Sequence, residues 1–195
     1  RNANNQKNWA RRSAASLPQQ FSMPASLRGH DFSVDLTDDQ IILLAWATTE
    51  GHISPGGAVL ISQKEGGTAD VIREVLGRLG YPYSEYKSVG AMRSFRVRSG
   101  FLTWAMDGEK VPRHELQVMS PRQAHLFIGH AVLGDGHVTT GGDKLALVEA
   151  WLAGGSQPSM CLAAKSDRFI NFVQTLCVLS GIKSRNYKDS DGFNR

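Results

Sequence analysis

The stretch LLAWATTEGHI, residues 43–53, places an apolar run directly before an acid, a glycine and a histidine. FIGHAVLGDGHV, residues 127–138, repeats this order further along the chain. Both runs are predominantly apolar, and each ends at an acid, Glu50 in the first and Asp135 in the second. One chain therefore builds the same junction between an apolar segment and a carboxylate twice.

Helix boundary signals flank both runs. Thr37 or Asp38 is a candidate N-cap for the first, while the second has Ser120 as a candidate cap and Pro121 at the first helical position. A glycine follows each acid and is a C-terminal stop signal. The sequence therefore predicts two helices that both carry an acid at the C-terminal end.

The internal similarity extends beyond these junctions. Residues 59–87 align without a gap to residues 160–188, which matches Lys64 with Lys165 and a Tyr-Lys pair at the end of each segment. The second half carries additional residues before its aligned segment, in GGDKLALVEAWLAGGSQPS. Their apolar middle could form a short inserted helix or strand between glycine turns.

The rest of the first half predicts alternating strands and helices. A hairpin around Pro-Gly-Gly, an amphipathic helix and two further strands are expected at residues 52–64, 68–81, 83–88 and 93–99. In the last strand, the period of two places Arg96 and Arg98 on one face with Ser94. The order helix, two strands, helix, two strands indicates an α+β fold.

Composition excludes some classes of protein. The chain has 195 residues, of which 41% are hydrophobic and 21% charged, and no apolar run approaches the ~20 residues of a membrane span. It opens without the apolar core of a signal peptide, so a cytoplasmic location is expected. Cys161 and Cys177 lack zinc-ligand spacing and are expected to be buried free thiols. The formal net charge of +4 favours a polyanionic partner only mildly.

An acid is an unfavourable residue at a helix C-terminus, because it faces the negative end of the helix dipole. Two such acids suggest a compensating divalent cation, whose preferred ligands are carboxylate and carbonyl oxygens. Small residues in both helices, Ala45, Ala47, Gly129 and Ala131, would let the two axes approach closely. The acids would then emerge together and form a metal site that serves two phosphates.

The two stretches resemble the signature helices of LAGLIDADG homing endonucleases, in the form found in inteins. The segment KVPRHELQVMSPRQAHLFIGHAVLGDGHV is especially similar to the approach to the second motif in inteins. The resemblance spans about residues 36–190. It implies two pseudo-symmetric αββαββ(α) halves, residues 36–110 and 111–195, which form a saddle of antiparallel strands with the signature helices at its centre. Residues 1–35 would be an N-terminal extension or a linker from a splicing region, although no splicing residues are present at either end.

The resemblance implies a monomeric enzyme that cuts double-stranded DNA with Mg²⁺ or Mn²⁺ bound by Glu50 and Asp135. Lys64 and Lys165 are the candidate catalytic lysines, and Gln63 is a candidate for ordering water. The implied DNA face comprises basic residues of the strand regions and the two histidines that follow the acids. These residues are Lys87, Arg93, Arg96, Arg98, Lys183, Arg185, Lys188, His52 and His137.

Two other functions are compatible with the sequence. One is a catalytically inactive protein of the same fold, such as a maturase or regulator, that binds nucleic acid without cutting it. The other is an ordinary α/β interaction domain that arose by duplication. The salt dependence of nucleic-acid binding distinguishes the interaction domain from the other functions, because phosphate binding weakens steeply as the salt concentration rises.

Overall fold

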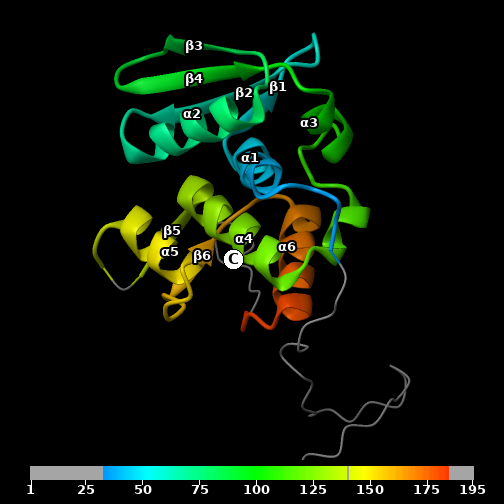
Figure 1. The fold of residues 1–195 in the computed structure, drawn as a ribbon, viewed down its shortest axis with the longest axis vertical. Coiled ribbons are helices and arrows are strands. Elements are labelled where there is room, and N and C mark those ends of the chain that lie inside the picture. The colour runs from blue at the N-terminus through cyan, green and yellow to red at the C-terminus, as the bar shows by residue number, and fades with distance from the viewer. Residues whose placement is uncertain (1–32, 140, 185–195) are drawn as a thin grey trace, which may run out of the picture.

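The computed structural model describes residues 33–139 and 141–184 and has an α+β fold (Figure 1). Its elements, in chain order, are α1 (Asp38–Thr49), β1 (Gly51–Ile53), β2 (Val59–Lys64), α2 (Gly67–Leu79), β3 (Tyr83–Lys87), β4 (Met92–Val97), α3 (Gly100–Ala105), the 3-10 helix η2 (His114–Val118), α4 (Pro121–Asp135), β5 (Gly136–Val138), α5 (Lys144–Leu152), β6 (Met160–Leu162) and α6 (Asp167–Ser180). Within the described residues, no helix has the length and apolar character that a membrane span needs.

Both predicted signature helices begin with a capping box. Thr37, rather than Asp38, caps α1: its hydroxyl accepts from the Gln40 backbone N–H at 3.2 Å, and the Gln40 side chain accepts from the Thr37 N–H at 2.9 Å. Ser120 and Gln123 make the same reciprocal pair at the start of α4, with distances of 3.2 and 3.0 Å. Two orphan N–H groups are satisfied at each helix start. The predicted boundaries at these positions are confirmed.

The first half forms an antiparallel sheet with strand order β1-β2-β4-β3 (Figure 1). One face packs against α2 and buries Ile61, Phe95 and Val97 completely. On the other face, the Ser62 and Ser94 hydroxyls hydrogen bond across β2 and β4 at 3.0 Å. The predicted hairpin, amphipathic helix and two further strands are therefore all present.

The second half repeats the first through α4, β5, β6 and α6, with α5 inserted between the two strands. The apolar middle of the extra segment is thus a helix, not a strand. It docks on α4 at Gly129, where an added Cβ would lie 3.2 Å from both Val148 and Leu152. The expectation that Gly129 faces α1 was wrong, because the inserted helix occupies that side of α4. The predicted final strands of this half lie beyond Ser184, outside the described residues.

Helices α1 and α4 lie side by side at the centre of the molecule, between the sheet with α2 and the α5–α6 region (Figure 1). The two helices are in close contact at Gly134, where an added Cβ would lie 3.0 Å from Thr49 Cβ and 3.3 Å from Glu50 Cγ, and closer still to the Thr49 hydroxyl. That hydroxyl donates to the Ala45 carbonyl at 3.0 Å, so it is satisfied inside the interface. A small residue of α4 therefore brings the acidic ends of both helices into contact.

We expect Gly134→Ala to lower the free energy of unfolding by about 1–3 kcal/mol, because the buried Thr49 side chain cannot move aside for the new methyl group. Gly77→Ala is the matched control. No atom lies within 4 Å of its added Cβ, so it should stabilise α2 by roughly 0.5–1 kcal/mol. Urea unfolding measures both changes. Equal effects of the two substitutions would contradict the close approach at Gly134.

Candidate functional site

The two acids lie at the same end of the paired helices. Glu50 is the C-cap of α1, and its backbone N–H donates to the Trp46 carbonyl at 2.9 Å. The Glu50 carbonyl in turn accepts from the Ser62 N–H of β2 at 3.4 Å. Asp135 is the last residue of α4 and directly follows Gly134, the contact point between the helices. The expected juxtaposition of the acids is present, while their function as metal ligands is still a prediction.

Their surroundings disfavour ionisation of both carboxylates. Burial raises the pKa of Glu50, and repulsion from Asp135 raises it further. Asp135 has an exposed surface, yet enough protein surrounds its carboxylate that desolvation raises its pKa as well. Desolvation is the main cause for both carboxylates, and the like charge of Asp135 adds to it at Glu50. Positive charge close to the pair opposes these shifts.

The first cation beside the acids is Lys110, which comes from the connection between the two halves. A turn built on Asp107 holds it: the Asp107 carboxylate accepts from the Glu109 and Val111 N–H groups, both at 2.9 Å. Lys110 itself has φ 63°, the only left-handed conformation of a non-glycine residue in the described part of the chain. Its Nζ lies 3.5 Å from the Thr49 carbonyl. Strained backbone of this kind needs support from its surroundings and clusters at functional sites.

The second cation is Lys144, the first residue of α5. Its Nζ donates to the Gly136 carbonyl at 3.0 Å and to the Val132 carbonyl at 3.3 Å, at the end of α4. The positive charge of Lys144 opposes the rise in the pKa of Glu50 more than Lys110 does, whereas Lys110 has the larger influence on the pKa of Asp135. Each lysine thus binds the end of one helix and acts most strongly on the acid of the other.

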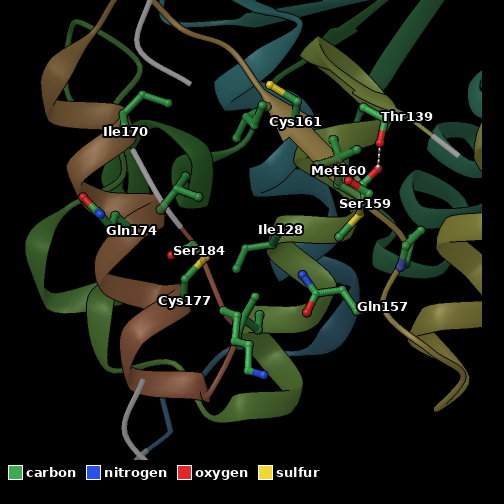
Figure 2. Close-up of a pocket in the computed structure, with 16 residues that line it drawn as sticks. Ile128, Thr139, Gln157, Ser159, Met160, Cys161, Ile170, Gln174, Cys177 and Ser184 are labelled. Carbon is green, nitrogen blue, oxygen red and sulfur yellow. Dashed lines mark hydrogen bonds between the residues drawn. The ribbon is translucent and has the colours of Figure 1, made fainter. Parts of the chain in front are cut away.

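A cavity of about 420 Å³ opens beside Asp135. It is lined by Thr48, Thr49, Glu109, Lys110, Asp135, Ala163, Ala164, Lys165, Ser166 and Phe169. The predicted catalytic lysine of the second half, Lys165, therefore shares this cavity with one acid and with Lys110. A separate cavity of about 510 Å³ lies between β6 and α6 and is lined by both free cysteines but by neither acid (Figure 2).

The structure does not bring the two candidate residues of the first half, Gln63 and Lys64, together at one site. Lys64 is exposed at the end of β2, on the face that carries Ser62, and does not line the cavity beside Asp135. Gln63 lies on the opposite face, which packs against α2, and its side-chain oxygen accepts from the Lys64 N–H at 2.8 Å. The expectation that Gln63 helps Lys64 at one site is therefore not supported by this geometry, since alternate residues of a strand point to opposite faces.

The strand register divides the predicted DNA face. His52, Leu60 and Arg96 are cross-strand partners in one row, so His52 and Arg96 share the face of the sheet that is not covered by α2. Lys87 and Arg93 pair with each other on the helix-covered face, where Arg93 also forms ion pairs with acids of the α2 side. Placing Lys87 and Arg93 on the same face as Arg96 was therefore wrong.

The remaining candidates fall into two groups. Arg98, His137 and Lys183 are exposed, just after β4, in β5 and just after α6, respectively. Arg185 and Lys188 lie outside the described residues.

Sequence reasoning missed Lys110 and Lys144. Lys110 is the first residue of the segment KVPRHELQVMSPRQAHLFIGHAVLGDGHV, which resembles inteins, so a signal existed, but no function was assigned to it. Lys144 lies in the inserted segment, which has no counterpart in the first half. Comparing the repeats could therefore not single it out, and its position near the acids depends on how α5 docks.

Comparisons with known structures reveal the same architecture. A structure of the homing endonuclease I-DmoI in complex with DNA and Mn has a TM-score of 0.52 to this chain, with 14% sequence identity, over 80% of this chain and 86% of that one. The I-DmoI complex with DNA and Ca gives 0.51 and 13%, over 80% of both chains. This chain has the LAGLIDADG fold.

A third similar structure is an I-DmoI variant in complex with its target DNA in the presence of Mg, with a TM-score of 0.50 and 14% identity over 80% and 86% of the two chains. No protein-family model matches the sequence, and no curated protein is significantly similar to it. At such low identity the structural similarity establishes the LAGLIDADG fold alone.

The acid pair fits a hard divalent cation. Glu50 and Asp135 supply carboxylate oxygens, and the ends of α1 and α4 add backbone carbonyls nearby. In the described residues no group of three or more His, Cys, Asp or Glu side chains is arranged for metal binding. A pair of acids fits Mg²⁺, which commonly takes one or two carboxylates together with water and substrate phosphate oxygens.

Removing either negative charge should stabilise the metal-free LAGLIDADG fold. Both pKa values are raised on folding, so the folded state binds more protons than the unfolded state and loses stability as the pH rises above the usual carboxyl range. We expect Glu50→Gln and Asp135→Asn each to raise the melting temperature by about 2 °C at pH 7 in EDTA. The gain should disappear below about pH 4, where the carboxyls are protonated.

Glu74→Gln provides the control for thermal melting, because Glu74 is an exposed residue of α2 far from the acid pair. It should change the melting temperature little at either pH. If the Glu50 and Asp135 variants melt below the wild type at pH 7 without metal, the two carboxylates are not in electrostatic conflict.

Proposed function

We propose that this protein is a DNA endonuclease that hydrolyses phosphodiester bonds in both strands of a specific duplex site. The single observation that carries the proposal is the acid pair at the contact of α1 and α4, flanked by Lys110 and Lys144. A protein that only binds nucleic acid needs basic groups but has no use for two carboxylates held together against their mutual repulsion. The similarity to I-DmoI complexes with DNA and divalent metal supports the same conclusion.

The residues around the acid pair have distinct functions in this proposal. Glu50 and Asp135 hold Mg²⁺ or Mn²⁺, which when bound would activate water and stabilise the leaving oxygen. Lys110 and Lys165, in the cavity beside Asp135, bind non-bridging phosphate oxygens and offset the negative charge on these oxygens in the transition state. Because one chain supplies both acids, a monomer is sufficient to cleave both DNA strands.

DNA binding in this proposal uses the face of the sheet that is not covered by α2. His52 and Arg96 lie in one cross-strand row there, and Arg98 continues the exposed series along the chain. Charged groups on such a surface neutralise phosphates and position the duplex, while sequence is read at the base edges. Lys64, exposed on the same face at the end of β2, would contact phosphate close to the sheet edge.

We expect Glu50→Gln and Asp135→Asn to reduce cleavage by at least about a hundredfold, the scale on which a single preorganised group contributes to a transition state. DNA binding should persist, because neither substitution removes a positive charge. The assay incubates a supercoiled plasmid library with randomised inserts with Mg²⁺ or Mn²⁺ and sequences the linearised products. Glu74→Gln should cut like the wild type. Wild-type protein that binds DNA yet cuts no member of the library would instead be a nucleic-acid-binding protein of this fold.

Substitutions of Arg96 and Arg93 provide a matched test of the DNA face, since each removes one positive charge from β4. Arg96→Ala should weaken duplex binding and reduce the slope of log K against log salt by about 1, the value for a lost phosphate contact. Arg93→Ala should leave the slope unchanged, because that side chain faces α2 and pairs with Glu65 and Glu85. Fluorescence anisotropy across a salt series measures both. Identical slopes for the two variants would refute the assignment of faces.

A further inference from the structure

Lys144 is held in place by the inserted helix that carries it. Asp143 caps α5 by accepting from the Leu145 and Ala146 N–H groups at 2.8 and 3.2 Å. Val148 of α5 is fully buried, and the helix packs against α4 at Gly129. The first residue of α5 therefore has a fixed position at the end of α4, unlike a lysine on a mobile surface loop.

The ammonium group of Lys144 is tied to helix α4 directly. It donates to the Gly136 and Val132 carbonyls at the C-terminal end of that helix, where the Val132 carbonyl also accepts from the Gly136 backbone N–H. These bonds place a positive charge next to Asp135, and Lys144 interacts electrostatically with both Asp135 and Glu50. Its position is partly buried, so solvent screens this charge incompletely.

The charges of the site nearly cancel in the absence of metal. Glu50 and Asp135 contribute two negative charges, and Lys110 and Lys144 contribute two positive charges. A divalent cation added to this set leaves a positive excess, which its repulsion from the lysines makes unfavourable. Phosphates of a bound duplex supply the missing negative charge, so metal and DNA should each favour the binding of the other.

We infer that Lys144 is an internal counter-ion that weakens metal binding to the free protein and thereby couples metal binding to DNA binding. The inference rests on the proposed function of the acid pair as the metal site. It concerns regulation of that site by a residue that lies outside the internal repeat. Lys144 is a positioning residue in this scheme and needs no contact with the reacting phosphate.

The direction in which metal affinity changes when Lys144 is replaced distinguishes the counter-ion function from a purely structural one. If Lys144 only fixed the end of α4, its loss would disorder Asp135 and weaken metal binding. If it acts as a counter-ion, its loss removes a repulsive charge and strengthens metal binding. Coulomb interaction across several ångströms of partly aqueous surroundings corresponds to a roughly 3- to 10-fold change in affinity.

Lys144→Gln is the decisive variant, because the amide keeps a donor for the Gly136 carbonyl and removes the charge. Lys144→Arg keeps the charge, and Lys87→Met removes a lysine from the far end of β3. Mn²⁺ binding to DNA-free protein, measured by electron paramagnetic resonance of the free ion, should tighten roughly 3- to 10-fold in Lys144→Gln. It should match the wild type in Lys144→Arg and Lys87→Met. Circular dichroism checks the fold of each variant.

The same titration with saturating nonspecific duplex at low salt tests the coupling. DNA should increase the Mn²⁺ affinity of the wild type, and should increase that of Lys144→Gln by a smaller factor. Unchanged or weaker Mn²⁺ binding by folded Lys144→Gln would overturn the inference. If Lys144→Gln does not fold, the wild type decides: Mn²⁺ affinity that DNA leaves unchanged would equally overturn it.

Glu50→Gln distinguishes failure of the inference from failure of the proposed function. In the wild-type background, this substitution should abolish or strongly weaken the Mn²⁺ binding being measured. If Mn²⁺ affinity does not depend on Glu50, the metal site is elsewhere and the proposed function itself is wrong. If it depends on Glu50 but does not increase in Lys144→Gln, only the counter-ion function fails.

Discussion

The structure depends on the close approach of α1 and α4 at Gly134. A residue without a side chain at this point lets Thr49 and Glu50 of α1 touch the backbone of α4, and the buried Thr49 hydroxyl satisfies itself on its own helix. The juxtaposition of the two acids follows from this contact. Two carboxylates share one end of the pair, where desolvation and, at Glu50, the charge of Asp135 make ionisation unfavourable.

The protein offsets this electrostatic conflict with two lysines that lie outside the aligned segments of the internal repeat. Lys110 comes from the connection between the halves and Lys144 from the inserted helix, and each reaches a carbonyl at the end of a signature helix. The backbone strain at Lys110 and the docking of α5 are the structural costs of placing these charges. A site that has two acids, two fixed lysines and an adjacent polar cavity is suited to phosphate chemistry, and the LAGLIDADG fold provides its scaffold.

Much of the fold could be predicted because its signals are local. Thr37 and Ser120 mark helix starts through hydrogen bonds to residues three positions away, and Pro121 does so through its fixed φ at the first helical position, so all three can be read without tertiary information. The phase of β4 was also readable: Arg93 has the same parity as Phe95, which already assigned it to the covered face. The position of Lys144 was not readable, since it depends on where an inserted helix docks on α4.

The origin of the two lysines limits how the molecule can be divided. A hybrid made from two copies of the first half would keep paired acids and the basic strands but would lack α5, and with it Lys144. The two halves therefore differ in the charges that they bring to the site. A symmetric homodimer built from the first half would regain the charge of Lys144 only if α5 were grafted onto it.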